Sequence, residues 1–239
     1  MANVLAPFGF RHIGYLDGAG APTYGVRRRK IALGNTNPIF HGDPIVGLNT
    51  GYIAQASTNT LADIAAGAAP TVSGIFQGCE YLSISQGRKV RSPYWPGSDA
   101  SADPDCFIID SPNAIFVAQA NGTPVVSVGA SSGIDLNCGM FIATGGSAAP
   151  TAGSGQGNTT NGLSGALIDT AGTNGSGSGA PATGAALPFR IVDLYSNFMV
   201  PGAPTAGSTG FNGTDNTTNY NWAVVTFNLA SLRRGALGI

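Results

Sequence analysis

Glycine and proline interrupt this chain so often that few windows could hold three turns of α-helix. The 239 residues include 36 Gly and 15 Pro, and both residue types destabilise a helix interior. Strong helix formers are also scarce, since Glu80 is the only glutamate in the sequence. We therefore expect no more than short helical turns, at residues 61–66 and 229–234, in a fold built from strands.

Short apolar or alternating runs bounded by Gly, Pro, Asn or Asp are typical of strands, and they recur along the whole chain. Turn sequences that favour positive φ connect neighbouring runs as hairpins require, at residues 48–52, 85–88 and 120–123. The pattern predicts an all-β fold, an antiparallel β-sandwich or barrel of jelly-roll type. The predicted strands are 24–31, 45–48, 52–55, 74–84, 89–93, 106–110, 115–119, 125–128, 134–138, 165–168, 189–194 and 222–228.

Composition changes along the chain predict four segments. They are an extended N-terminal arm (1–22), a β core (23–144), a long Gly/Ser/Ala-rich loop (145–186) and C-terminal strands that complete the β domain (187–239). The loop has only Leu163, Leu167 and Ile168 as apolar anchors, too few to offset the entropy lost when about 40 residues become ordered. We expect contacts with a neighbouring subunit to order this loop, and we expect the arm to reach across subunit boundaries.

Charge is unusually sparse in this sequence. Lys, Arg, Asp and Glu make up 10% of the chain, against about 25% in a typical soluble domain. Small neutral residues must cover the surface instead, which suits permanent contact inside an assembly. The net charge of -1 argues against electrostatic capture of nucleic acid or of an anionic membrane. With neither a long apolar span nor a recognisable secretory signal, we expect synthesis in the cytoplasm.

The sequence offers little material for catalysis or metal binding. His12 and His41 have no histidine partner at metal-binding spacing, and no phosphate-binding loop or nucleophile motif is present. We predict no enzymatic activity and no cofactor. An acidic run could hold calcium, but solvated loop acids are the commoner explanation, so no metal site is predicted. The cysteines are read as buried free thiols, although a disulfide stays open. The acidic residues are Asp99, Asp103, Asp105 and Asp110, and the cysteines are Cys79, Cys106 and Cys138.

Two features are candidate partner contacts. The basic run Arg27, Arg28, Arg29 and Lys30 lies in a predicted strand, whose alternation splits it between two faces. It is interpreted as a clamp onto an acidic surface of a neighbouring subunit, with DNA contact or a charge-protected edge strand as alternatives. In the rigid segment 92–97, Tyr94 and Trp95 either anchor a partner or pack over the end of their own domain.

Several motifs together resemble a group of tailed-phage proteins. These relatives are small virion proteins associated with the major capsid protein, generally regarded as cement or decoration subunits. The resemblance spans roughly residues 3–120, with weaker echoes at 190–194 and 222–232, and it implies no catalytic residues. The motifs are NVLAPFGF at 3–10, IFHGDPIV at 39–46, GIFQGCEY at 74–81, SPYWP at 92–96 and IDSPN at 109–113, a run that ends in Phe116.

The resemblance implies a structural virion protein that binds and stabilises the major capsid protein shell. Its partners would be that protein and neighbouring copies of itself as a homo-oligomer on the capsid. The loop 145–186 and the insertion 201–221 depart from the pattern, which puts copy number and binding position in doubt. One alternative is a tail-fibre, spike or host-adhesion subunit, although no internal repeat is visible. Another is a virion-associated glycan hydrolase that uses two carboxylates of the acidic run or Glu80.

Overall fold

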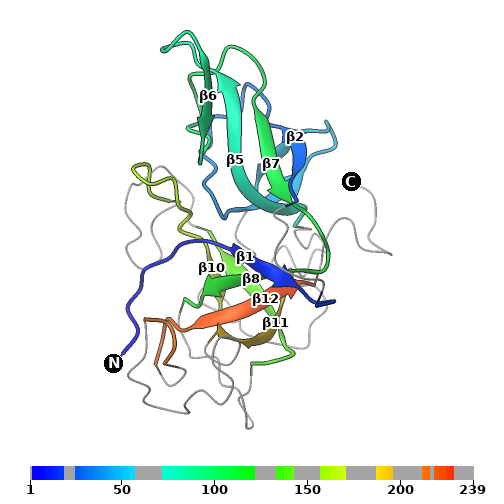
Figure 1. Cartoon of the computed structure of the whole chain (residues 1–239), viewed down its shortest axis with the longest axis vertical. Coiled ribbons are helices and arrows are strands. Elements are labelled where there is room, and N and C mark those ends of the chain that lie inside the picture. The colour runs from blue at the N-terminus through cyan, green and yellow to red at the C-terminus, as the bar shows by residue number, and fades with distance from the viewer. Residues whose placement is uncertain are drawn as a thin grey trace.

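The protein is an all-β sandwich. The computed structural model describes residues 2–18, 25–56, 72–121, 133–142, 157–170, 187–195, 212–215 and 218–228. All twelve elements assigned in this part are strands, and they form two antiparallel sheets that pack together without closing into a barrel (Figure 1). The predicted antiparallel all-β fold is confirmed, as a sandwich. The possible turns at 61–66 and 229–234, and the strand at 125–128, lie outside the described residues.

Among the described residues, each sheet contains six strands. Sheet A has the order β1 (Arg11–Tyr15), β8 (Ala114–Gln119), β12 (Trp222–Phe227), β11 (Phe189–Leu194), β9 (Asn137–Phe141) and β10 (Leu167–Asp169). Sheet B has the order β2 (Arg27–Lys30), β7 (Asp105–Ile109), β5 (Gly74–Leu82), β3 (Pro44–Gly47) and β4 (Ile53–Gln55), and β6 (Lys89–Ser92) pairs with the far end of β5. The predicted hairpins at 48–52 and 85–88 are confirmed, because β3 pairs with β4 and β5 pairs with β6.

Two buried clusters form most of the core. Between the sheets, the aromatic rings of Phe10, Phe189 and Phe227 stack on one another, and Ile75 and Ile109 of sheet B join this cluster. A second cluster, which includes Trp95, lies against the opposite face of sheet B. Sheet B is therefore covered on one face by its own core and on part of the other face by sheet A.

Strand β5 is long enough to extend past the cover of sheet A. Ile75 pairs with Ile109 in the inter-sheet core, while Glu80, further along the same face, pairs with Asp105. A bulge between Phe76 and Gly78 lies between the two pairs. A glycine is required there, because Gly78 has φ +126° and a Cβ atom would lie 2.8 Å from the Ser92 carbonyl oxygen.

Residues 2–18 pack against the rest of the chain. Strand β1, which the sequence pattern missed, forms the edge of sheet A beside β8. Asn3 is buried, and its Nδ2 donates to the Asp215 carbonyl oxygen (2.6 Å) while its Oδ1 accepts from the Gly213 amide (2.8 Å). The expected arm thus contributes a strand and buried contacts to its own domain.

Part of the predicted Gly/Ser/Ala-rich loop is built into sheet A. Residues 157–170 include β10, which pairs with β9. Two of the predicted anchors, Leu167 and Ile168, are buried there. The stretches 145–156 and 171–186 lie outside the described residues. Within the part of the chain that is described, no helix has the length and apolar character needed to cross a membrane.

A buried carboxyl group joins the segments where the two sheets meet. Asp43 accepts hydrogen bonds from the Phe40 amide (2.7 Å), from Gln55 Nε2 (2.7 Å) and from Ser164 Oγ. Next to it, the Gly42 carbonyl oxygen accepts from the Phe10 amide (2.9 Å). Burial raises the pKa of Asp43 to about 7, against the pull of these three donors.

We predict that Asp43 makes folding stability pH-dependent. The folded-state pKa lies above the unfolded value of 3.8. The contribution of neutral Asp43 to the free energy of unfolding is therefore complete below pH 3.8 and is lost as pH rises through about 7. The loss is on the order of 4 kcal/mol. Asp43→Asn mimics the neutral acid and should not show it. Urea unfolding of both proteins between pH 4 and 8 measures the difference between their free energies of unfolding, in which the contributions of the other carboxylates cancel. A difference that stays constant across this range would contradict the prediction.

Candidate functional site

The basic run forms an edge strand of sheet B. Strand β2 pairs with β7 along one side, with Lys30 opposite Asp105 and Arg28 opposite Phe107. Arg28 and Lys30 therefore share one face of the sheet. The side chains of Arg27 and Arg29 project from the opposite face. Arg27 pairs with Asp110 (3.0 Å), and Arg29 donates to the Gly51 carbonyl oxygen (3.2 Å). The predicted split between two faces thus follows from the register.

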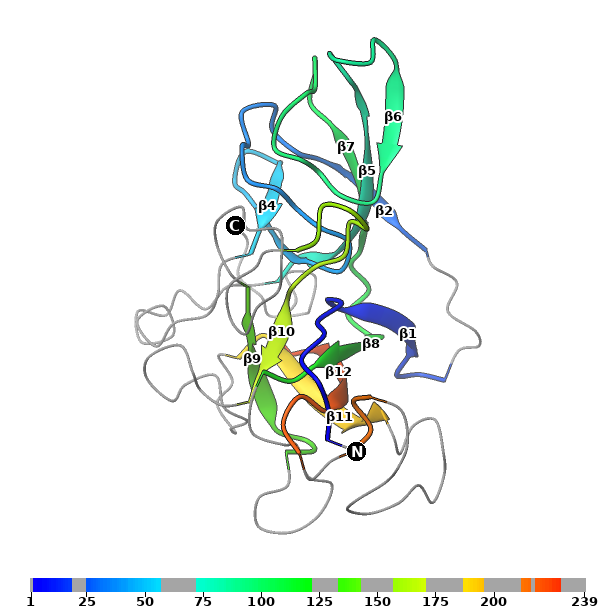
Figure 2. The same cartoon turned by 90° about the vertical axis from the view of Figure 1, so that its left-hand side faces the viewer.

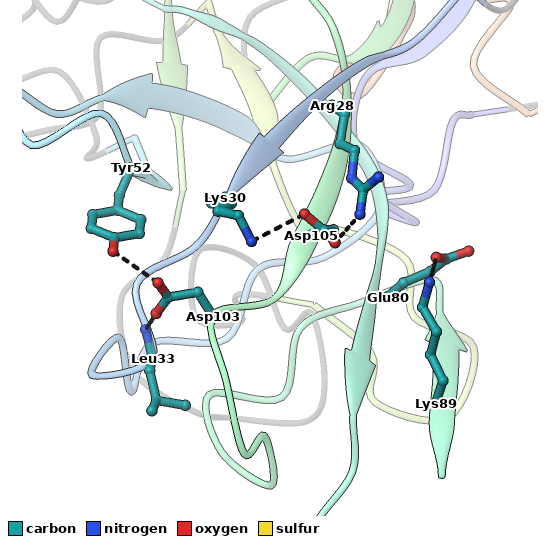
Figure 3. A network of polar contacts seen from close by, with 8 residues as sticks. All are labelled: Arg28, Lys30, Leu33, Tyr52, Glu80, Lys89, Asp103 and Asp105. Atoms are coloured by element: carbon teal, nitrogen blue, oxygen red, sulfur yellow. Dashed lines mark hydrogen bonds and ion pairs between the residues drawn. The ribbon is translucent and has the colours of Figure 1, made fainter.

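The face that carries Arg28 and Lys30 continues across four strands. Asp105 and Phe107 of β7 lie beside them, Glu80 and Leu82 of β5 follow, and Lys89 and Arg91 of β6 complete the row, because Glu80 pairs with Arg91 and Leu82 with Lys89. We call these eight residues the charged face. Figure 3 shows Asp105 between Arg28 and Lys30, and Glu80 beside Lys89. The face comprises Arg28, Lys30, Glu80, Leu82, Lys89, Arg91, Asp105 and Phe107.

Cations hold both carboxylates of the charged face. Asp105 pairs with Arg28 and, at 3.4 Å, with Lys30, while Glu80 pairs with Lys89 at 2.6 Å (Figure 3). The hydrogen bond from Arg28 lowers the pKa of Asp105, and the one from Lys89 lowers the pKa of Glu80. Both acids are therefore ionised at neutral pH. With four cations and two carboxylates, the charged face has a formal charge of +2, opposite in sign to the whole chain.

Most of the positive charge in the chain lies on or next to the strands that carry this face. Seven of the eleven Lys and Arg residues lie in β2, in β6 and in the turn before β6. Arg28 and Lys89 have 63% of their side-chain surface exposed, and exposed ion pairs contribute only about 0–1 kcal/mol to stability. The stability of the fold therefore does not explain why charge is concentrated here.

The β5–β6 hairpin adds apolar surface to the charged face. Leu82 is 50% exposed, and Ile84 in the turn is 68% exposed. Figures 1 and 2 both place this hairpin at the end of the molecule opposite the start of the chain. Apolar side chains bordered by cations at a projecting tip are typical of a protein-binding surface.

An open pocket of 560 Å³ lies beside β2. One wall consists of Arg28, Arg29 and Lys30, and the other is the β3–β4 turn with Tyr52. The Tyr52 hydroxyl donates to Asp103 (2.8 Å), which also accepts from the Leu33 amide (2.9 Å; Figure 3). These bonds fix the turn, so the pocket is bounded by an ordered wall. The lining residues are Arg28, Arg29, Lys30, Thr50, Gly51, Tyr52 and Asp105.

The two aromatic candidates lie inside the domain. Trp95 is fully buried in the sheet B core, its indole Nε1 donates to the Asn35 carbonyl oxygen (3.1 Å), and its backbone bonds to Ile39. Tyr94 is half-buried and stacks on Phe40, with ring centroids 5.3 Å apart. The position of Trp95 fits the alternative in which it packs within its own domain, because no part of its side chain reaches the surface.

Ser164 and His41 have structural partners. Ser164 is buried and donates directly to Asp43, and His41 Nδ1 lies 3.3 Å from the Gln77 carbonyl oxygen. Among the residues that the structure describes, no three His, Cys, Asp or Glu side chains gather closely enough to hold a metal ion. The cysteines are free and buried, as the sequence predicted: Cys79, Cys106 and Cys138.

The contribution of β6 was not predicted from the sequence. The contiguous basic run in β2 was the predicted site, whereas Lys89 and Arg91 belong to the same surface. The alternation Lys89-Val90-Arg91 within a predicted strand was the available signal, since it places both cations on one face. The pairing of β6 with β5 then brings that face into line with β2.

We predict that Trp95 acts in folding. Replacing it with alanine should lower the free energy of unfolding by about 3–5 kcal/mol, because a large buried side chain leaves a cavity. Leu82→Ala, at an exposed position of the same sheet, is the control and should cost less than about 1 kcal/mol. Chemical denaturation measures both values. A Trp95→Ala protein as stable as the control would contradict the buried role.

No protein-family model, curated protein or solved structure matches this chain. The motif resemblance to phage capsid proteins therefore stays a prediction.

Proposed function

We propose that this chain is a structural virion protein, a cement or decoration subunit that binds the shell of the major capsid protein through the charged face and stabilises it. The observation that carries the proposal is that four cations, Arg28, Lys30, Lys89 and Arg91, share one face of sheet B, in a region that holds seven of the eleven cations of the chain. In a chain that is only 10% charged, such a face is the surface best suited to recognise an acidic partner.

The chemistry of the face supports protein docking. Leu82 and Ile84 provide exposed apolar surface, and the cations around them provide electrostatic complementarity and register. A specific contact of this kind buries about 800 Å² on each partner. Many copies on one shell would add avidity, so that modest individual contacts could resist internal pressure.

The carboxylates named for a glycan hydrolase favour the structural role. Asp99 accepts hydrogen bonds from Ser83 and Ser85. These bonds lower its pKa, and partners likewise lower the pKa of Asp103 and Asp105. A glycosidase needs one carboxyl group with a raised pKa to protonate the leaving group. The described carboxylates of the acidic run serve instead to fix loops and pair cations.

The test is occupancy on shells assembled from the major capsid protein encoded in the same genome. We predict that Arg28→Glu combined with Lys89→Glu lowers the bound copy number roughly tenfold or more at moderate salt, because both charges then repel an acidic partner. Gel densitometry of purified shells measures the copy number. The control is Arg190→Glu on sheet A, an exposed arginine outside the charged face, which should keep full occupancy.

Three results would contradict the proposal. One is equal occupancy for the charge-reversal protein and the Arg190→Glu control. Another is a copy number of single to low tens per purified virion, which would indicate a tail component. The third is turnover of host polysaccharide that Asp→Asn changes abolish, which would indicate a hydrolase.

A further inference from the structure

Among the described residues, one backbone edge of strand β2 is paired only at its end. The Ile31 amide donates to the Pro104 carbonyl oxygen on the β7 side (3.0 Å), so alternation directs the backbone groups of Arg29 toward β7 and those of Arg28 and Lys30 away from it. Within the described ranges, the only pairing of this edge is the parallel bridge between Ile31 and Ile53 at its end.

The open pocket lies along this edge. From the Ile31–Ile53 bridge, β2 runs beside the β3–β4 turn, where Arg29 reaches the Gly51 carbonyl oxygen. The edge groups of Arg28 and Lys30 therefore border a 560 Å³ space whose far wall is that turn. An extended peptide placed there would have main-chain partners on β2 and side-chain space in the pocket.

The charge of the pocket lining indicates which kind of peptide the pocket would bind. The pocket lining includes three cations, Arg28, Arg29 and Lys30, and one acid, Asp105, a formal surplus of two positive charges. Asp105 already pairs with Arg28 and Lys30, whereas Arg29 has only a carbonyl oxygen as its side-chain partner among the described contacts. A carboxylate is the complementary group.

We propose that an acidic, extended segment of the partner protein adds to sheet B as a strand along β2, with its carboxylates directed into the pocket toward Arg29 and Lys30. This inference rests on the proposed function and specifies how the charged face holds its partner. Main-chain hydrogen bonds to both backbone groups of Arg28 and to the Lys30 amide fix the segment, and the cations select acidic side chains.

A peptide fits this site better than a nucleic acid does. The free edge presents alternating amide and carbonyl groups, which match another peptide backbone. Nucleic-acid binding is accordingly an outcome that the test must detect.

The first test uses the full chain and the peptide acetyl-Thr-Asp-Val-Asp-Val-Glu-Thr-amide, followed by NMR. We predict that the peptide protects the amides of Arg28 and Lys30 from hydrogen exchange, while the Arg29 amide is protected with or without it. N-methylation of alternate peptide residues should weaken binding roughly three- to tenfold for each lost hydrogen bond. N-methylation of the intervening residues should be tolerated.

Three outcomes of this test overturn the proposal. They are the absence of binding, equal sensitivity to N-methylation at every position, and tighter binding of a ten-residue thymidine oligonucleotide than of the peptide. A peptide with Lys in place of each acidic residue is the charge control, and it should leave the exchange of both amides unchanged.

The second test separates strand addition from docking by charge alone. Arg28→Pro removes both the charge and the outward amide, whereas Arg28→Gln removes only the charge. Strand addition predicts that the proline variant loses at least threefold more shell occupancy than the glutamine variant. Equal losses in two folded proteins would overturn strand addition and leave the proposed docking face intact. If neither variant, nor the charge-reversal protein, loses occupancy, the proposed function fails as well.

Discussion

The pairing of β5 with β7 is the interaction on which both the core and the charged face depend. At one end it places Ile75 and Ile109 between the two sheets, and at the other it places Glu80 beside Asp105 in solvent. One surface of one strand pair thus changes from apolar to ionic along its length. Because the bulge at Gly78 keeps both pairs on the same face, the sheet that completes the core also carries the site.

Charged residues are few in this molecule, and the basic ones are clustered on sheet B. Small neutral residues make up much of the chain. The exposed ion pairs of sheet B add little to its stability. A desolvated charge, by contrast, contributes strongly when a partner supplies the complementary group. The arrangement is better suited to recognition than to folding, which is why the position of the cations is more informative than their number.

The sequence predicted strands well where apolar runs end in turn residues, as in 74–84 and 222–228, since burial and turn chemistry are local signals. It missed β1, because the segment Arg11–Tyr15 has no apolar alternation and is held by pairing with β8. The burial of Trp95 and the position of Asp43 depend on segments far apart in the chain. The charged face could be predicted only in part, because its halves meet through strand register.

Apart from the bridge at Ile31, no strand among the described residues covers the outer edge of β2. Such an edge would ordinarily make free subunits prone to aggregate, because two of them can join into a continuous sheet. Here every residue of that strand is a cation. Two copies that approached edge to edge would bring like charges into direct opposition, which disfavours the pairing. The basic residues therefore keep unassembled copies apart and leave the edge open for a partner of the opposite charge.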